Sequence, residues 1–250
     1  MRNNQLSKNR RTIDFLGIGG HACGSTKLYQ LMKAHPQIGF VHRSKEAGVD
    51  IRGKECHYWD RYSERPIEWY LSYFQWSFPR VGEITPAYAR LDEATVAKVA
   101  SAFPDIHVFF VIRNTLDRTW SNIRKNIVKQ GIKNPTVEWM IEQASHPKTL
   151  SRNDYLRTVK LWHKAYGDRF HVILFDRFVA NPLPVMLKIA DWLSIDAEFY
   201  RQLSTSILNM PINSTPKLNM PPTFMDWFSL NNRFEWDLQV AEIMEITSIN

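Results

Sequence analysis

Hydrophobic and polar positions alternate between two patterns along the chain. Short apolar runs rich in β-branched and aromatic residues are typical of buried strands, and they occur at Ile13–Ile18, Ile38–Val41, Val81–Ile84, Asp105–Arg113 and Phe170–Phe175. Apolar residues at helical spacing predict helices before Pro36, after Asn114, and at Pro66–Phe74, Leu91–Phe103, Asn153–Tyr166, Pro184–Leu193 and Asp237–Ile246. Strands that alternate with helices predict a central parallel sheet covered on both faces, hence an α/β protein.

One domain accounts for this pattern. A chain of 250 residues is long enough for a single α/β domain with a sizeable core, and no repeat or interdomain linker divides it. Residues 1–12 are polar and basic, which predicts a flexible arm ahead of a domain at 13–250. The polar stretch Arg43–Gly53 is predicted to be a loop, and the periodicity fades after Tyr200.

The turn between the first strand and the first helix is rich in glycine. Four glycines between residues 17 and 24 precede Ser25 and Thr26. Such a turn bares backbone N–H groups at the positive end of a helix and favours a bound phosphate, although tight turns also need glycine for steric reasons. The spacing fits the motif G-x-x-x-x-G-K-[ST], except that Ser25 replaces the lysine that contacts the β- and γ-phosphates in kinases and nucleoside triphosphatases.

A second candidate anion site follows the run Asp105–Arg113. In nucleoside triphosphatases the comparable strand commonly ends in a carboxylate that holds Mg²⁺, whereas this run ends in Arg113. Asn114 can cap the next helix, and Ser121 lies about two turns into it. Arg113 and Ser121 can therefore reach one phosphate without a metal. We expect the other basic residues of this helix, Arg118, Lys125 and Lys129, to form a solvent-exposed face.

The segment KECHYWDRY, residues 54–62, places titratable side chains close together. If it is extended, Glu55 and His57 project to one face, with Asp60 shortly beyond. A carboxylate beside an imidazole is a usual general base. Two alternatives remain: a solvated polar turn, and a metal site that includes Cys56, which is less favoured because an extended chain turns Cys56 to the other face.

Charge and cysteine content narrow the classes of ligand and the cellular compartment that the sequence predicts. The formal net charge is +7 and the sequence pI is about 9.4, which favours an anionic ligand such as a nucleotide, a phosphate, an acidic glycan or nucleic acid. Two cysteines give neither a disulfide framework nor a metal motif. The chain has no apolar run of about 20 residues and no signal-peptide core. We therefore expect a cytoplasmic protein without a membrane span.

Four motifs occur together in a characteristic order: FLGIGGHACGSTKLYQLMKAHPQI, KECHYWDRY, VGEITPAYA and VIRNTLDRTWS. In these motifs, from about Ile13 to Ile195, the chain resembles sulfotransferases that use 3′-phosphoadenosine 5′-phosphosulfate (PAPS), and is most similar to their bacterial and heparan-sulfate-type branches. The resemblance implies a single P-loop-like α/β domain. It also implies transfer of a sulfuryl group to a hydroxyl or amine of a carbohydrate-like or small acceptor, with release of adenosine 3′,5′-bisphosphate (PAP) and without nucleic acid or a metal.

The resemblance also implies roles for particular residues. Arg113 and Ser121 would bind the 3′-phosphate, and Glu55 would be the general base with His57 and Asp60 as its support. The 5′-phosphosulfate would lie on His21, Ala22, Cys23, Gly24, Ser25, Thr26 and Lys27. Independently of the resemblance, the polar composition of Asn213–Asn219 predicts a loop that can close over a ligand, and Lys217 in this loop is a candidate cofactor-binding residue.

One position departs from that family pattern. Relatives usually carry Lys or Arg two residues before Gly24, where this chain has Ala22. Three interpretations stay open: His21 or Lys27 substitutes for the missing cation, Lys54 does so from the neighbouring segment, or the protein is a poor catalyst. Ala22→Lys is expected to raise turnover with little change in nucleotide affinity. The competing functions are a P-loop kinase-like enzyme and a nucleotide- or glycan-binding protein that has lost transfer chemistry.

Overall fold

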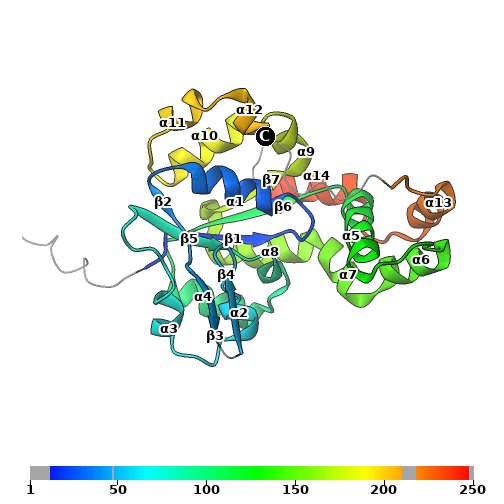
Figure 1. Cartoon of the computed structure of the whole chain (residues 1–250), viewed down its shortest axis with the longest axis horizontal. Helices are drawn as coiled ribbons and strands as arrows, with labels where there is room; N and C mark the ends of the chain where they lie inside the picture. The colour runs from blue at the N-terminus through cyan, green and yellow to red at the C-terminus, as the bar shows by residue number, and fades with distance from the viewer. Residues whose placement is uncertain (1–11, 47, 210–217, 248–250) are drawn as a thin grey trace, which may run out of the picture.

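The computed structural model describes residues 12–46, 48–209 and 218–247. Its centre is a five-stranded sheet in the order β2-β5-β1-β6-β7, and all of its strand pairs are parallel (Figure 1). The strands are β1 (Phe15–Gly19), β2 (Ile38–Gly39), β5 (Arg80–Ile84), β6 (His107–Ile112) and β7 (Phe170–Leu174). The predicted α/β class with a central parallel sheet is confirmed.

Helices cover both faces of the sheet because the strands are apolar on both sides. One face packs against α1 (Ser25–Ala34), α9 (Phe175–Ala180), α10 (Pro182–Trp192), α11 (Glu198–Gln202) and α12 (Thr205–Leu208). The other packs against α2 (Tyr58–Arg61), α3 (Ile67–Leu71), α4 (Glu93–Ala102), α8 (Tyr155–Tyr166) and α14 (Trp236–Thr247), with the short turns η1 (Pro86–Arg90) and η2 (Gly167–Arg169). Neighbouring strand residues point to opposite faces, as Phe109 and Phe110 do.

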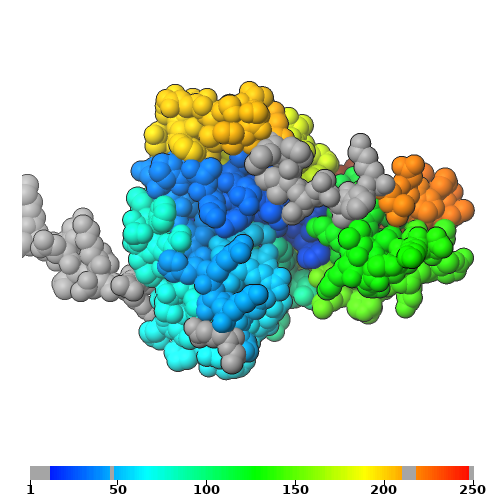
Figure 2. All heavy atoms as spheres, in the orientation of Figure 1, coloured from blue at the N-terminus to red at the C-terminus, as the bar shows by residue number. Residues whose placement is uncertain are grey.

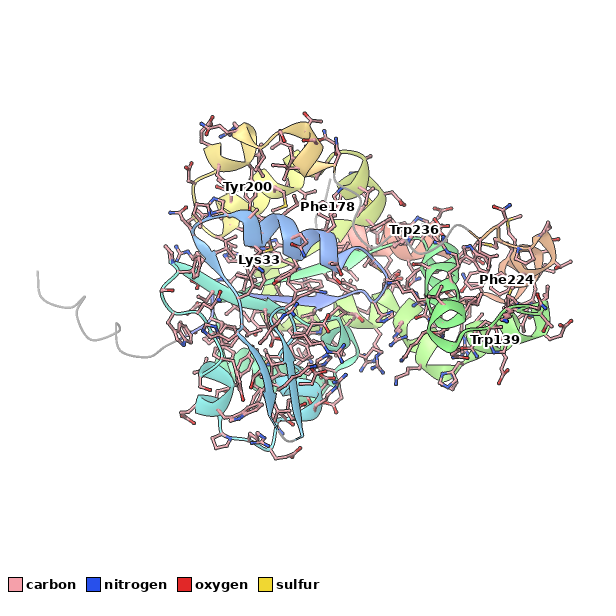
Figure 3. All side chains as sticks on the ribbon, in the orientation of Figure 1. Lys33, Trp139, Phe178, Tyr200, Phe224 and Trp236 are labelled. Atoms are coloured by element: carbon pink, nitrogen blue, oxygen red, sulfur yellow. The ribbon has the colours of Figure 1, made fainter. Side chains whose placement is uncertain are left out.

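A helical side lobe leaves the main body after β6. It comprises α5 (Thr115–Gln130), α6 (Val137–Ser145), α7 (Pro147–Asn153) and α13 (Pro222–Asn231), and Figures 1 and 2 show it projecting to the right. A separate apolar cluster holds it together, with Phe224 of α13 packed among side chains of α5 and α6 (Figure 3). Asn114 caps α5 as expected, because its side chain accepts hydrogen bonds from the N–H groups of Leu116 and Asp117.

The prediction of a loop at Arg43–Gly53 is wrong. The segment forms an antiparallel hairpin of β3 (Arg43–Glu46) and β4 (Val49–Arg52). Val49 and Ile51 alternate with polar residues and are buried on the main core. Two apolar positions are too few to indicate a strand in a polar stretch, so packing against the core decides the structure here.

Several predictions fall outside the described residues. The expected N-terminal arm at 1–12 lies there apart from Thr12, and so does Lys217. Among the helices that the structure describes, none is long and apolar enough to cross a bilayer.

Candidate active site

The glycine-rich turn lies at the carboxyl end of β1 and leads into α1. Helix α1 begins at Ser25 with Gly24 as its N-cap; among the described residues no side chain caps its first N–H groups, and its first turn has no acidic residue. Gly24 has φ 79°, and a Cβ there would lie 2.8 Å from the ring of Phe175. The helix end is therefore available to an anion, as the sequence indicated.

Arg113 lies beside this turn at the end of β6. Its guanidinium stacks over the ring of Phe175, 4.4 Å from the centroid, and the same ring abuts Gly24. Within the described ranges Arg113 forms no ion pair, and its Nε is buried without a hydrogen-bond partner. Ser121 on α5 is buried. An unpaired guanidinium held next to a helix N-terminus is suited to a second anionic group of one ligand.

The KECHYWDRY segment brings its charged groups into a connected chain. Nε2 of His57 lies 3.3 Å from Oε2 of Glu55, and Nδ1 of His57 lies 3.0 Å from Oδ1 of Asp60. Nζ of Lys54 donates to Oε1 of Glu55 at 3.0 Å and to Oγ of Ser25 at 3.1 Å. One ammonium group therefore bridges the glycine-rich turn and the candidate base.

The segment is not extended, contrary to the geometry assumed from sequence. Residues 54–57 form an irregular loop, His57 adopts a left-handed conformation with φ 59°, and α2 follows at once. Glu55 and His57 meet because of this turn and not because of strand alternation. His57 is only 6% exposed, so a solvated polar turn is excluded. The described residues contain no group of His, Cys, Asp and Glu side chains that could hold a metal ion.

Electrostatics fix the charge state of the pair. Burial alone would raise the pKa of Glu55, but the hydrogen bond from His57 and the charge of Lys54 outweigh it and lower the pKa to about 2. Burial alone would lower the pKa of His57, but its hydrogen bonds to Asp60 and Glu55 raise it to about 9. At neutral pH an imidazolium therefore lies between two carboxylates.

Sequence reasoning assigned no role to Glu83, which supports this segment. Glu83 is fully buried on β5, and its carboxylate accepts hydrogen bonds from the hydroxyls of Tyr70, Tyr88 and Thr85 and from the backbone N–H of Cys56. Because Cys56 stands between Glu55 and His57, this carboxylate fixes the backbone that carries both. A glutamate inside an apolar strand was the available signal.

The loop residues take up different positions. His21 is largely buried, and burial together with the charges of Arg152 and Lys125 lowers its pKa to about 3. Lys27 directs its Nζ toward the ring of Phe178, 5.9 Å from the centroid. The thiol of Cys23 is buried 3.7 Å from the hydroxyl of Tyr155. Ala22 has φ 66°.

The expectation that Arg118 faces solvent is wrong. Arg118 is fully buried, and it donates hydrogen bonds to Asn153, Thr119 and the carbonyl of Thr149, which join α5 to α7. Lys125 is partly buried and Lys129 is exposed, so only Lys129 follows the expectation fully.

A cavity of about 510 Å³ opens in front of Glu55 and His57. Its lining includes the cationic residues Arg52, Arg61, Arg90, Lys129, Lys148 and Arg152 and the uncharged His21. A second cavity of about 470 Å³ runs along α5 and α7 and shares four of them, His21, Lys129, Lys148 and Arg152. The candidate base therefore faces a space dominated by positive charge.

The fold of this chain is similar to those of solved sulfotransferases. Over 96% of this chain the fold superposes on 98% of a sulfotransferase from Alicyclobacillus acidocaldarius, with a TM-score of 0.68 and 18% identity. It also superposes, over 96% of this chain and 99% of the other, on the sulfotransferase domain from the curacin biosynthetic pathway, with a TM-score of 0.52 and 15% identity. The fold is therefore that of the sulfotransferases.

Sequence comparison points to the same class. Residues 85–198 match the model of the "Sulfotransferase family", and the chain is 23% identical over 192 residues to human heparan sulfate glucosamine 3-O-sulfotransferase 5. That match covers 71% of this chain and 52% of the relative, so this chain spans about half the length of that relative. The resemblance to sulfotransferases that the motifs indicate is confirmed as a likeness in both sequence and fold.

Proposed function

We propose that this protein transfers a sulfuryl group from PAPS to a hydroxyl or amine, with Glu55 as the general base. The observation that carries the proposal is the hydrogen-bonded chain Lys54–Glu55–His57–Asp60, in which Lys54 and His57 are buried and which connects the glycine-rich turn to a cavity. In this proposal the base and the donor site share the ammonium group of Lys54, which donates to both Glu55 and Ser25. A reaction between a bound donor and a bound acceptor needs this proximity.

The donor would be held at its two phosphate-bearing ends. The N–H groups of the turn and α1 would bind the 5′-phosphosulfate, while Arg113 and Ser121 would bind the 3′-phosphate. Support comes from the N-terminus of α1, which no side chain of the described residues caps, and from the guanidinium of Arg113, which has no ion-pair partner among those residues and stacks on Phe175 beside this turn. Fixed backbone and side-chain donors supply the positive field in this scheme, and no metal is required.

In the transfer step, Glu55 removes the proton from the acceptor as its oxygen or nitrogen forms a bond to sulfur. The bond between sulfur and the bridging oxygen breaks, and its electron pair stays on the 5′-phosphate of PAP. The imidazolium of His57, held by Asp60, orients the carboxylate. The proton then leaves Glu55 for water, which restores the base.

The acceptor would be an acidic molecule, either carbohydrate-like or small. Of the basic residues that line the cavity, four have no carboxylate partner among the described residues: Arg90, Lys129, Lys148 and Arg152. Uncompensated cations in a partly enclosed space favour carboxylate or sulfate groups on the ligand.

Two measurements test the function. Calorimetry compares PAP with ATP in the presence and absence of Mg²⁺; a sulfotransferase binds PAP without Mg²⁺, whereas preference for Mg²⁺-ATP would support the kinase-like alternative. Transfer of ³⁵S from labelled PAPS is then followed across acidic and neutral sugars and phenols. PAP binding without transfer to any acceptor would support a binding protein that has lost the chemistry.

A further inference from the structure

The phosphate-binding turn lacks a cation of its own, and the structure narrows the residues that can replace it. The neutral side chain of His21, with its pKa lowered to about 3, carries no charge at physiological pH. Lys27 lies on the side of α1 that packs against α9, with its Nζ toward the ring of Phe178. Neither the side chain of His21 nor that of Lys27 therefore supplies a positive charge at the N-terminus of α1.

Lys54 is differently placed. It is 9% exposed, and its backbone is fixed to the sheet because its carbonyl accepts a hydrogen bond from the N–H of Ile84. Two of the three N–H groups on Nζ donate to Ser25 and Glu55, which leaves one for a ligand. Ser25 is the first residue of α1, so an anion at that helix end lies against the ammonium group.

Resting on the proposed function, we infer that Lys54 replaces the missing loop cation and divides its charge between the leaving 5′-phosphate and the base Glu55. A cation at position 22 would divide these two tasks between separate side chains. Here they share one, so that donor binding draws positive charge away from Glu55.

The chemical consequence follows from charge balance. As the sulfur–oxygen bond breaks, negative charge grows on the 5′-phosphate, and Lys54 stabilises it without transferring a proton. The stronger that interaction, the less Lys54 stabilises ionised Glu55, and the better the carboxylate accepts the acceptor's proton. Bound donor therefore activates the base, and acceptor is deprotonated only when donor is in place.

Nucleotide binding tests the placement of Lys54 without any acceptor. PAP carries the 5′-phosphate and adenosine 3′-phosphate does not. Calorimetry should show that Lys54→Gln weakens PAP binding about tenfold and changes adenosine 3′-phosphate binding less than twofold. Lys33→Gln, an equal charge change at the exposed end of α1, is the matched control and should change neither. Equal effects on both ligands, or none on PAP, would overturn the inference.

Two further variants keep the test decisive. If Lys54→Gln does not fold, Lys54→Arg retains the charge and should preserve the preference for PAP; loss of that preference in a folded Lys54→Arg protein contradicts the proposal. Adding Ala22→Lys to Lys54→Gln should recover at least half of the free energy of PAP binding that Lys54→Gln loses. If nothing is recovered, the inference that Lys54 replaces the loop cation is contradicted. Failure of the unchanged protein to bind PAP would instead reject the proposed function itself.

Discussion

At the residue scale, His57 couples the candidate site to stability. Its pKa is about 9 in the folded protein against an ordinary value of 6.5, so its ion pairs stabilise the fold fully below about pH 6.5. That contribution is lost as pH rises through 9. Glu55, with a pKa of about 2 against 4.5, contributes fully above about pH 4.5, and its contribution is lost as pH falls through 2.

We therefore expect the free energy of unfolding to fall between pH 7 and 10 more steeply in the unchanged protein than in His57→Gln. The difference should be on the order of 2 kcal/mol, because a shifted pKa is a free-energy difference between protonation states. Urea denaturation at several pH values measures it. Parallel pH profiles for the two proteins would show that His57 is not an imidazolium in the fold.

Glu83 gives a second prediction at this scale. Its buried carboxylate accepts four hydrogen bonds from uncharged donors, two on each oxygen. The side-chain amide of glutamine would turn its own N–H groups toward two of these donors and lose their hydrogen bonds. Glu83→Gln should cost about 2 kcal/mol of stability and lower turnover at least tenfold, while PAP affinity falls less than threefold. Glu93→Gln, which breaks only an exposed pair with Lys164, is the control.

Turnover, measured beside PAP affinity, distinguishes a role of Glu83 in positioning Glu55 and His57 from a purely structural role. If Glu83 only stabilised the fold, turnover and PAP affinity measured well below the unfolding transition would both match those of the unchanged protein. Selective loss of turnover would place its effect on the segment with Glu55 and His57.

Site residues that stand close together in one short motif could be predicted from the sequence. Residues whose position depends on contacts between distant segments could not. Glu55, His57 and Asp60 stand within six residues, so their proximity was predictable even though the assumed backbone was not. The burial of Arg118 depends on Asn153 and Thr149, more than thirty residues away, and a basic helix gives no sign of that contact.

At the element scale, the junction of β1, α1 and α9 makes a specific prediction. Gly24→Ala would place a methyl group 2.8 Å from Phe175, whose ring also supports Arg113, and should therefore lower PAP affinity at least tenfold. Gly48→Ala is the matched control, because Gly48 has the same φ of 79° but no atom within 4 Å of the added Cβ. Calorimetry with PAP measures the effect: Gly48→Ala should leave PAP affinity nearly unchanged, and an equal loss in both variants would contradict a role for the contact with Phe175.

Elements with strong periodicity were predictable, and those defined by packing were not. Strands β1, β5, β6 and β7 are apolar on both faces, and they agree with prediction to within a few residues. The hairpin β3–β4 and the short helices α11, α12 and α13 have weak patterns of their own. They acquire structure from contact with the core or with the side lobe, which a local window does not contain.

At the scale of the whole molecule, part of the excess positive charge lines the cavity in front of Glu55 and His57. The formal charge of +7 includes four cavity cations that the described part of the chain leaves without carboxylates. We expect Arg90→Gln to raise KM for an acidic acceptor about tenfold, with kcat and the KM for a neutral acceptor nearly unchanged. Lys98→Gln, on the exposed face of α4, is the control. Equal changes for acidic and neutral acceptors would contradict recognition by charge.

The overall architecture was predictable because motifs in a fixed order constrain a fold more than any single motif does. The side lobe was not foreseen as a unit, since α13 joins α5 and α6 from nearly a hundred residues later. Its contacts with the second cavity, through Lys129 and Lys148, are likewise a product of topology.

The ring of Phe175 lies next to Gly24 and also supports the guanidinium of Arg113. If the two proposed anion sites are correct, this one rigid ring fixes the distance between them. Dinucleotides or monophosphates whose charged groups are separated by a different length would meet only one end at a time, so discrimination among adenine nucleotides here would rest on molecular length as much as on charge.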